Sequence, residues 1–264
     1  MNDLIVVKDD EKERYKEYEE LLLRRDQLER DAGSYLTIYT KEFGDMITAN
    51  FELKVECIKK KKTIAYCRRR MNRDLPIDAH HMQEEIDQEM KLYYVQLQDM
   101  IKDAKAAKNS QSVGEYEARL AKKIYRRLAK RLHPDINRKT MKNETLRELW
   151  ERIRKAYDKY DADELADLEA LVKKALEELG EKGFKIDFDN IEDRIERIER
   201  QINDILSTEP YTYGELLEDK DRKKAHKSML EEEHMDYERY LEMLQKTLDD
   251  MLSEKGVKLI WKMN

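Results

Sequence analysis

Residues 36–71 read LTIYTKEFGDMITANFELKVECIKKKKTIAYCRRRM and contain no proline. Within this stretch, every third or fourth residue belongs to a stripe that is apolar at most of its positions. The stripe consists of Leu36, Tyr39, Phe43, Met46, Asn50, Leu53, Cys57, Lys60, Ile64, Cys67 and Met71. These spacings place the side chains along one face of an α-helix and are typical of a coiled-coil seam. The stretch therefore predicts one long helix that packs against another helix.

The sequence on either side of this stretch predicts further helices. Residues 74–78 read DLPID, and they interrupt the pattern because proline disfavours helix in the preceding residue, while Asp78 can cap a new helix. The spacing of three and four resumes at Ile86, Met90, Tyr93, Leu97, Met100 and Ala104. We expect residues 79–107 to pack antiparallel on the first long helix, with a polar hinge at residues 108–112. A rougher stripe upstream predicts a helix over residues 10–32.

The C-terminal third of the chain contains two more apolar seams. The first consists of Ile191, Ile195, Ile198, Ile202 and Ile205, and the second of Leu230, His234, Tyr237, Leu241, Leu244, Leu248 and Met251. The connection between them passes through Pro210 and Gly214 and is short enough to favour an antiparallel pair within the chain. We therefore expect a second long helical hairpin, with His234 in a polar layer of its seam.

The composition favours an all-α fold. The 264 residues include only 7 Gly, 3 Pro and 4 Phe, whereas 42% are charged. Strands need turn residues and alternating patterns that this sequence lacks. The large share of charged residues predicts a high ratio of surface area to volume, and hence an elongated molecule. We expect it to be built of helical hairpins with coiled-coil-like seams. We expect an N-terminal hairpin over residues 1–110, a small helical unit over 111–180 and a C-terminal hairpin over 181–264.

Charge, the N-terminus and the cysteines disfavour several classes of protein. The net charge of −6 argues against general affinity for nucleic acids. The only apolar run near the N-terminus is residues 4–7, which is too short for a signal peptide or a membrane span, so we expect a cytoplasmic protein.

Cys57 and Cys67 lie about 15 Å apart along one predicted helix, beyond the reach of a disulfide. Both are expected to be reduced and buried in a seam.

The central unit carries a short motif between two predicted helices. Residues 122–132 read KKIYRRLAKRL, an amphipathic helix that runs directly into His133-Pro134-Asp135, where proline ends the helix. The six cations outside its apolar face are Lys122, Lys123, Arg126, Arg127, Lys130 and Arg131. A second helix follows, with Leu146, Leu149, Ile153, Ala156 and Tyr157 on its apolar face. We expect the two helices to form an antiparallel pair with the tripeptide at its exposed tip.

These residues resemble the J-domain of DnaJ-type co-chaperones: a basic helix, a His-Pro-Asp loop and a second helix that ends in Ile-Arg-Lys-Ala-Tyr. The resemblance covers about residues 113–172, and a random ordering of this composition contains the tripeptide with a probability of roughly one in 200. It implies docking on a DnaK-type ATP-dependent chaperone and stimulation of that partner's ATPase. His133, Pro134 and Asp135 would be the trigger, and the six cations would form the docking face. Asp135 could pair with an arginine of the partner.

The chain also departs from the usual members of that family. Residues 113–121 lack the Tyr and Leu-Gly signature of a first helix, and no Gly/Phe-rich linker or Cys-rich zinc domain is present. We therefore expect a divergent, single-module member that needs no cofactor and is itself no enzyme. The flanking hairpins would select an unknown client or partner. A monomer is favoured, although a dimer stays open.

A second interpretation is a coiled-coil scaffold in which the J-like unit is degenerate and the hairpins bind, with nucleic acid as a less favoured partner. Cationic runs at residues 59–62 and 68–70 could contact phosphates, but consecutive helical residues point around the axis and form no single stripe. His80, His81, Glu84 and Glu85 lie at helical spacing but lack the further ligands of a metal site. No phosphate-binding loop or catalytic triad pattern is evident.

Overall fold

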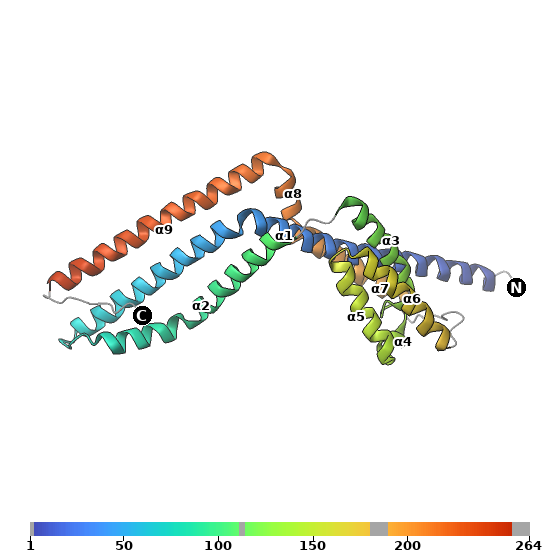
Figure 1. Cartoon of the computed structure of the whole chain (residues 1–264), viewed down its shortest axis with the longest axis horizontal. Coiled ribbons are helices and arrows are strands. Elements are labelled where there is room, and N and C mark those ends of the chain that lie inside the picture. Colours follow the sequence, from blue (N-terminus) through green and yellow to red (C-terminus); the bar gives the residue numbers. More distant parts are fainter. Residues whose placement is uncertain (1–2, 111–113, 180–189, 255–264) are drawn as a thin grey trace. The chain divides into compact units, whose positions relative to one another are not determined.

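The computed structural model describes residues 3–110, 114–179 and 190–254 (Figure 1). These residues form nine helices and no strand, which confirms the prediction of an all-α fold. The helices are α1 (Asp3–Met71), α2 (Ala79–Asn109), α3 (Glu115–Leu132), α4 (Arg138–Lys142), α5 (Glu144–Asp158), α6 (Ala162–Glu178), α7 (Ile191–Ser207), α8 (Tyr213–Glu218) and α9 (Lys220–Glu254). Helix α1 continues through Gly33, so the two helical stretches expected over residues 10–71 are one element.

The chain forms two compact units, each made of two separate stretches of sequence. Unit 1 comprises Met1–Ser34 and Gln111–Thr212, and unit 2 comprises Tyr35–Ser110 and Tyr213–Asn264. This division differs from the three consecutive domains expected above. The first part of α1 belongs with the central helices, and α9 belongs with α1 and α2. The difference arises because apolar faces far apart in the sequence cover one another.

In unit 2, α1 and α2 form the antiparallel hairpin that the sequence predicts. The Asp78 carboxylate accepts hydrogen bonds from the backbone N–H groups of His80 and His81, which caps α2 where it was expected to begin. Ion pairs join Lys108 to Asp45 and Lys62 to Glu89, so residue numbers fall along α2 as they rise along α1. The chain reversal at residues 72–78 is therefore confirmed.

Helix α9 runs parallel to α1 in the same unit. Asn50 Nδ2 donates to the carbonyl oxygen of Leu230 at 2.9 Å, and Lys60 Nζ donates to Gln245 Oε1 at 2.6 Å, so residue numbers rise together along both helices. The seam on α1 that contains Asn50, Cys57 and Lys60 thus faces α9. The antiparallel pairing expected between residues 191–205 and 230–251 is not what forms, because each of these seams packs on α1 instead.

The polar layer expected around His234 is present in unit 2. The Asn50 side chain is 3% exposed, and its Oδ1 lies 2.8 Å from His234 Nδ1. Cys57 and Cys67 are both buried and free, as expected, and burial raises the pKa of each thiol. Within the described part of the chain, no helix is long and apolar enough to cross a membrane.

The core of unit 1 is formed by α3, α5 and α6. The apolar side chains predicted for the first two helices are buried: Tyr125, Leu128, Ala129, Leu132, Leu146, Leu149, Ile153, Ala156 and Tyr157. Helix α6 covers this pair with Leu165, Leu168 and Val172, none of which is exposed. A compact helical unit around the His-Pro-Asp loop is thus present.

The first part of α1 also packs on this unit. Leu23 joins the core of α3, α5 and α6, while Tyr18, Leu22 and Leu28 form a second cluster with Ile136 and the isoleucines of α7. Arg25 Nη1 donates to Gln201 Oε1 of α7 at 3.4 Å. Helix α1 is therefore held from two sides, and it runs directly past residues 133–136.

Candidate functional site

Backbone hydrogen bonds fix the His-Pro-Asp loop at the end of α3. The N–H of His133 donates to the carbonyl of Ala129 at 2.8 Å, and the His133 carbonyl accepts from Ile136 N at 2.9 Å and Asn137 N at 2.7 Å. The Asn137 side chain also donates to the carbonyl of Arg131 at 3.0 Å. These bonds satisfy groups that Pro134 leaves unpaired by ending the helix. The loop is thereby held in one conformation.

His133 lies inside the unit, which corrects the expectation that the tripeptide forms an exposed tip. Its side chain is buried, with the ring edge-on to Trp150 at 5.0 Å between centroids. The backbone N–H of Asp135 donates to His133 Nδ1 at 3.2 Å, so the ring proton belongs on Nε2. Nε2 lies 3.5 Å from Asp26 Oδ2 on α1. The histidine is buried because α1 covers it, which the local sequence does not reveal.

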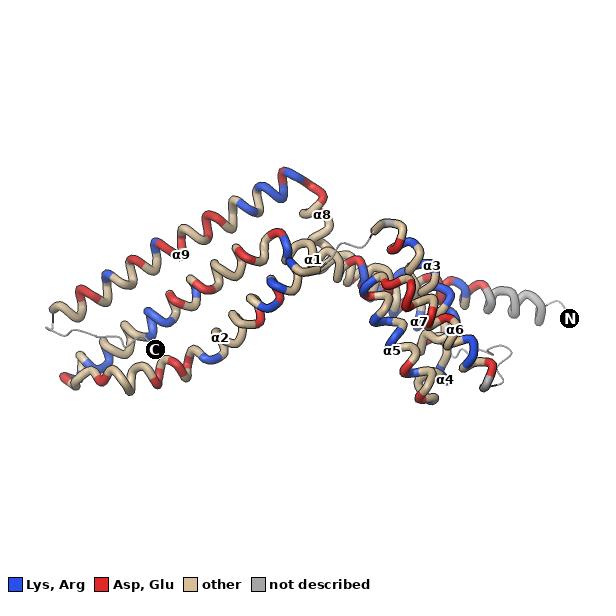
Figure 2. The backbone as a smooth tube through the Cα atoms, in the orientation of Figure 1, with Lys and Arg blue, Asp and Glu red and all other residues tan. Residues whose placement is uncertain are grey.

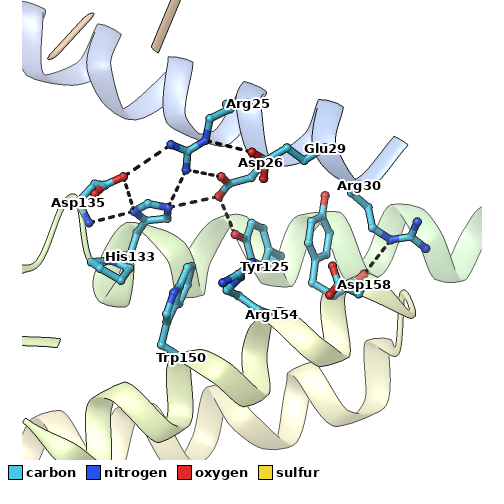
Figure 3. Close-up of a pocket in the computed structure, with 12 residues that line it drawn as sticks. Arg25, Asp26, Glu29, Arg30, Tyr125, His133, Asp135, Trp150, Arg154 and Asp158 are labelled. Carbon is cyan, nitrogen blue, oxygen red and sulfur yellow. Dashed lines mark hydrogen bonds and ion pairs between the residues drawn. The ribbon is translucent and has the colours of Figure 1, made fainter. Parts of the chain in front are cut away.

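Asp26 is the buried carboxylate at the centre of the site (Figure 3). Its Oδ2 accepts a hydrogen bond from the Tyr125 hydroxyl at 2.6 Å, and its Oδ1 accepts one from Arg25 Nη2 at 2.8 Å. Burial by itself would raise the pKa of Asp26, but the contacts with His133, Tyr125 and Arg25 outweigh it and lower the pKa to about 2. Asp26 is therefore ionised at neutral pH.

Arg25 lies between Asp26 and the motif, as Figure 3 shows. Its Nη1 is 3.7 Å from Asp135 Oδ2, and its Nη2 is 3.4 Å from His133 Nε2. Burial would lower the pKa of Arg25, but the carboxylates of Asp26, Glu29 and Asp135 raise it overall. Its Nε is buried and has no hydrogen-bond partner among the described residues. Arg25 is thus a permanent cation with two carboxylates on α1, Asp26 and Glu29, and a third, Asp135, on the loop.

The six cations predicted as a docking face have different surroundings. Three of them pair within unit 1: Lys122 with Asp31 at 3.7 Å, Lys130 with Glu19 at 2.9 Å, and Arg127 with Glu169 through two bonds of 2.7 Å. Lys123, Arg126 and Arg131 are exposed and form no ion pair within the described part of the chain. Three of the six cations predicted as a docking face are therefore without an ion pair among the described residues.

A recess of about 500 Å³ opens beside the motif. Its lining comes from α1, α3, the loop and α5: Arg25, Asp26, Glu29, Arg30, Tyr125, His133, Pro134, Asp135, Trp150, Arg154, Tyr157 and Asp158. Asp135 is 48% exposed at its edge, and Pro134 is half-buried. The recess combines carboxylates, arginines and aromatic rings, which suits contact with polar side chains of another protein.

Sequence reasoning missed Arg25 and Asp26. One signal could have marked Asp26, because it follows the apolar Leu22 by four residues and so belongs to the inner face of its helix. A charge at such a position is almost always paired when it is buried. The identity of the partner could not be found in this way, since His133 lies 107 positions further along the chain.

The histidines and cationic runs that the sequence singled out lie next to carboxylates of α2. His80 pairs with Glu84 at 3.5 Å and His81 with Glu85 at 3.9 Å, and the described residues include no cluster of three or more His, Cys, Asp or Glu side chains suited to a metal. In the cationic runs, Lys62 pairs with Glu89 and Arg69 with Glu85. Along α9, Lys and Arg gather at residues 220–227, and Asp and Glu predominate from residue 231 onward (Figure 2).

Comparisons with protein-family models, curated proteins and solved structures found no match to this chain.

Proposed function

We propose that this chain is a J-domain-like co-chaperone that docks on a DnaK-type chaperone and stimulates the ATPase of that partner. The observation that carries the proposal is the placement of Asp135. Its half-exposed carboxylate stands at the end of basic helix α3, on a loop held by backbone hydrogen bonds. A carboxylate on a rigid loop beside cations suits a partner that offers an arginine within an acidic surface.

His133 acts in this proposal as a positioning residue. Its Nδ1 accepts the backbone N–H of Asp135, and its ring is fixed by Trp150 and Asp26. Because the His133 side chain is buried, it does not contact the partner itself in this proposal. It acts by fixing the orientation of Asp135, which does. Pro134 restricts the backbone dihedral angle φ within the same loop.

The exposed cations of α3 provide the attraction toward the partner. Lys123, Arg126 and Arg131 are exposed and have no ion pair within the described residues, so their charge remains available. Such a patch raises the association rate with an acidic surface and weakens as salt increases. ATP is hydrolysed at the active site of the partner in this proposal, and this chain changes only the rate.

Unit 2 would select the client or the partner complex. It carries large apolar side chains that are exposed to solvent, including Leu92 and Val95 on α2 and Met229, Met235 and Met243 on α9. Exposed apolar side chains on helices are common at protein-binding surfaces. A cytoplasmic location is also part of this proposal.

One observation favours the alternative of a scaffold with a degenerate J-like unit. The burial of His133 against Asp26 and Trp150 gives the motif an internal task, namely to hold α1 on the unit. A loop with that task needs no chaperone partner. The two proposals differ in whether Asp135 matters to any ATPase.

Steady-state ATP hydrolysis by a DnaK-type chaperone tests the proposal. The wild-type chain should stimulate hydrolysis, and Asp135→Asn should weaken the stimulation by about tenfold or more because a charged hydrogen bond to the partner is lost. Asp158→Asn is the matched control, since Asp158 is an exposed carboxylate on the same recess with no ion pair among the described residues. If the folded wild-type chain stimulates no DnaK-type ATPase, the scaffold proposal replaces this one.

A further inference from the structure

Helix α1 offers the J-like unit the same kinds of groups that a docking partner would have to offer. Arg25 lies 3.7 Å from the Asp135 carboxylate, and the acidic side chain of Glu19 pairs with Lys130 at 2.9 Å. Asp31, six residues after Arg25 on the same helix, reaches Lys122 at 3.7 Å. An arginine for the loop and carboxylates for α3 are therefore already supplied within the chain.

The contact between Arg25 and Asp135 is of a kind that a competitor can displace. Its 3.7 Å separation exceeds a normal hydrogen bond, and the Asp135 side chain is 48% exposed. Ion pairs of this kind contribute little stability. By contrast, Arg25 bonds Asp26 at 2.8 Å in the interior, so its guanidinium can stay on Asp26 when Asp135 is taken by another cation.

The helix itself is expected to stay in place while this exchange occurs. Three and two residues before Arg25, Leu22 is completely buried and Leu23 is 8% exposed. Removing such side chains from an apolar core costs far more than breaking a half-exposed ion pair. Only the outer Nη1 of Arg25 has to leave Asp135.

We propose that Arg25 is an internal competitor for Asp135, so that the free chain is partly inhibited and a partner must displace Arg25 in order to dock. This inference rests on the proposed co-chaperone function and names the regulation of the same site. Anything that draws Arg25 away from the loop would increase docking. The acidic groups within reach are Asp26, which already binds Arg25, and Glu29, whose Oε1 lies 3.9 Å from Arg25 Nε.

The test compares the half-saturating concentration for stimulation of a DnaK-type ATPase across a set of variants. Arg25→Gln should lower this concentration by about two- to fivefold, the range for an ion pair that is exposed at its Asp135 end. Arg25→Lys, which keeps a charge beside Asp26 but lacks the fork that reaches two carboxylates, should act in the same direction. Arg24→Gln is the control, because Arg24 is an exposed neighbour with no ion pair among the described residues.

A double variant separates competition from a general structural effect. In the Asp135→Asn background, Arg25→Gln should no longer change the response, because the carboxylate for which the two cations compete is neutral. A change that persists in that background would overturn the inference. Thermal unfolding of each variant shows whether it is folded, and Arg25→Lys keeps the test decisive if Arg25→Gln loses its structure.

The outcomes distinguish the two proposals. If wild type and Arg25→Gln stimulate with equal half-saturating concentrations, or if the variant needs more, internal competition is wrong while the co-chaperone function stands. If neither stimulates although both are folded, the co-chaperone function fails, and this inference fails with it. A decrease for both Arg25 variants, absent for Arg24→Gln, supports both proposals.

Discussion

At the scale of single residues, Asp26 controls the geometry of the site. Its carboxylate is 9% exposed and receives Tyr125 and Arg25, with His133 at 3.5 Å. A buried carboxylate without such partners would take up a proton, whereas this one stays ionised. The ionised Asp26 carboxylate, which lies on α1, thereby holds the His133 ring against that helix.

The pKa of Asp26 predicts how stability depends on pH. Its folded value of about 2 lies below the ordinary aspartate pKa of 3.8, so the unfolded state binds its proton at higher pH than the folded state does. The stabilisation is complete above about pH 4 and is lost as the pH falls through about 2. Urea unfolding of wild type and Asp26→Asn should show a difference of roughly 2 kcal/mol at pH 7 that shrinks across this window. A difference independent of pH would contradict the assignment.

His133→Gln should destabilise unit 1, because the histidine is buried rather than exposed. The substitution disturbs the contact with Asp26 and the ring packing on Trp150, and we expect a loss of about 1–3 kcal/mol. Asp135→Asn, at a half-exposed side chain, should stay within about 0.5 kcal/mol. Chemical unfolding monitored by circular dichroism measures both. Equal stability of His133→Gln and wild type would show that the histidine is not held as described.

At the scale of helices, α3 has two faces with different environments. Leu128 is 1% exposed and Leu132 is completely buried, whereas Lys123 and Arg126 face solvent. Charge changes on the outer face should therefore alter docking, and changes on the inner face should alter folding.

Two leucines of α3 give a matched test of this division. Leu128→Ala should lower the free energy of unfolding by about 2–5 kcal/mol, because it leaves a cavity among α3, α5 and α6. Leu120→Ala, one of the exposed apolar side chains, should cost about 0.5 kcal/mol or less. Urea unfolding of the two variants provides the comparison. Similar losses for both would mean that the inner face of α3 has been assigned to the wrong side.

At the scale of the whole molecule, each unit is assembled from segments that are distant in the sequence. Unit 1 needs Met1–Ser34 together with Gln111–Thr212, and unit 2 needs Tyr35–Ser110 together with Tyr213–Asn264. The chain changes from one unit to the other three times, and the first change, after Ser34, occurs inside continuous helix α1.

This arrangement predicts where a protease cuts first. Limited proteolysis should cleave near Ser110 and residues 207–212, where α2 and α7 end, because loops open at lower cost than helices. The change of unit after Ser34 should resist, since it lies within a helix. Mass spectrometry of the early fragments identifies the sites. Early cleavage within residues 40–70 would be incompatible with α1 as described.

The sequence alone determined the local features of this protein. The spacing of apolar residues predicted the helices on either side of residues 74–78 and the buried faces of α3 and α5, because periodicity reports which face of a helix avoids water. Proline after a basic helix likewise predicted the loop at residues 133–135. These features depend on residues within a few turns of one another.

Only the tertiary structure decided which faces meet. The isoleucine seam of α7 and the seam of α9 matched each other in pattern, yet each packs on a different part of α1. The burial of His133 had the same cause, because Asp26 and Arg25 reach it from more than a hundred residues away. An apolar stripe indicates that one face of a helix is buried, but not which helix covers it. Any complementary stripe of the chain could cover that face, and the packing of the whole unit selects one of them.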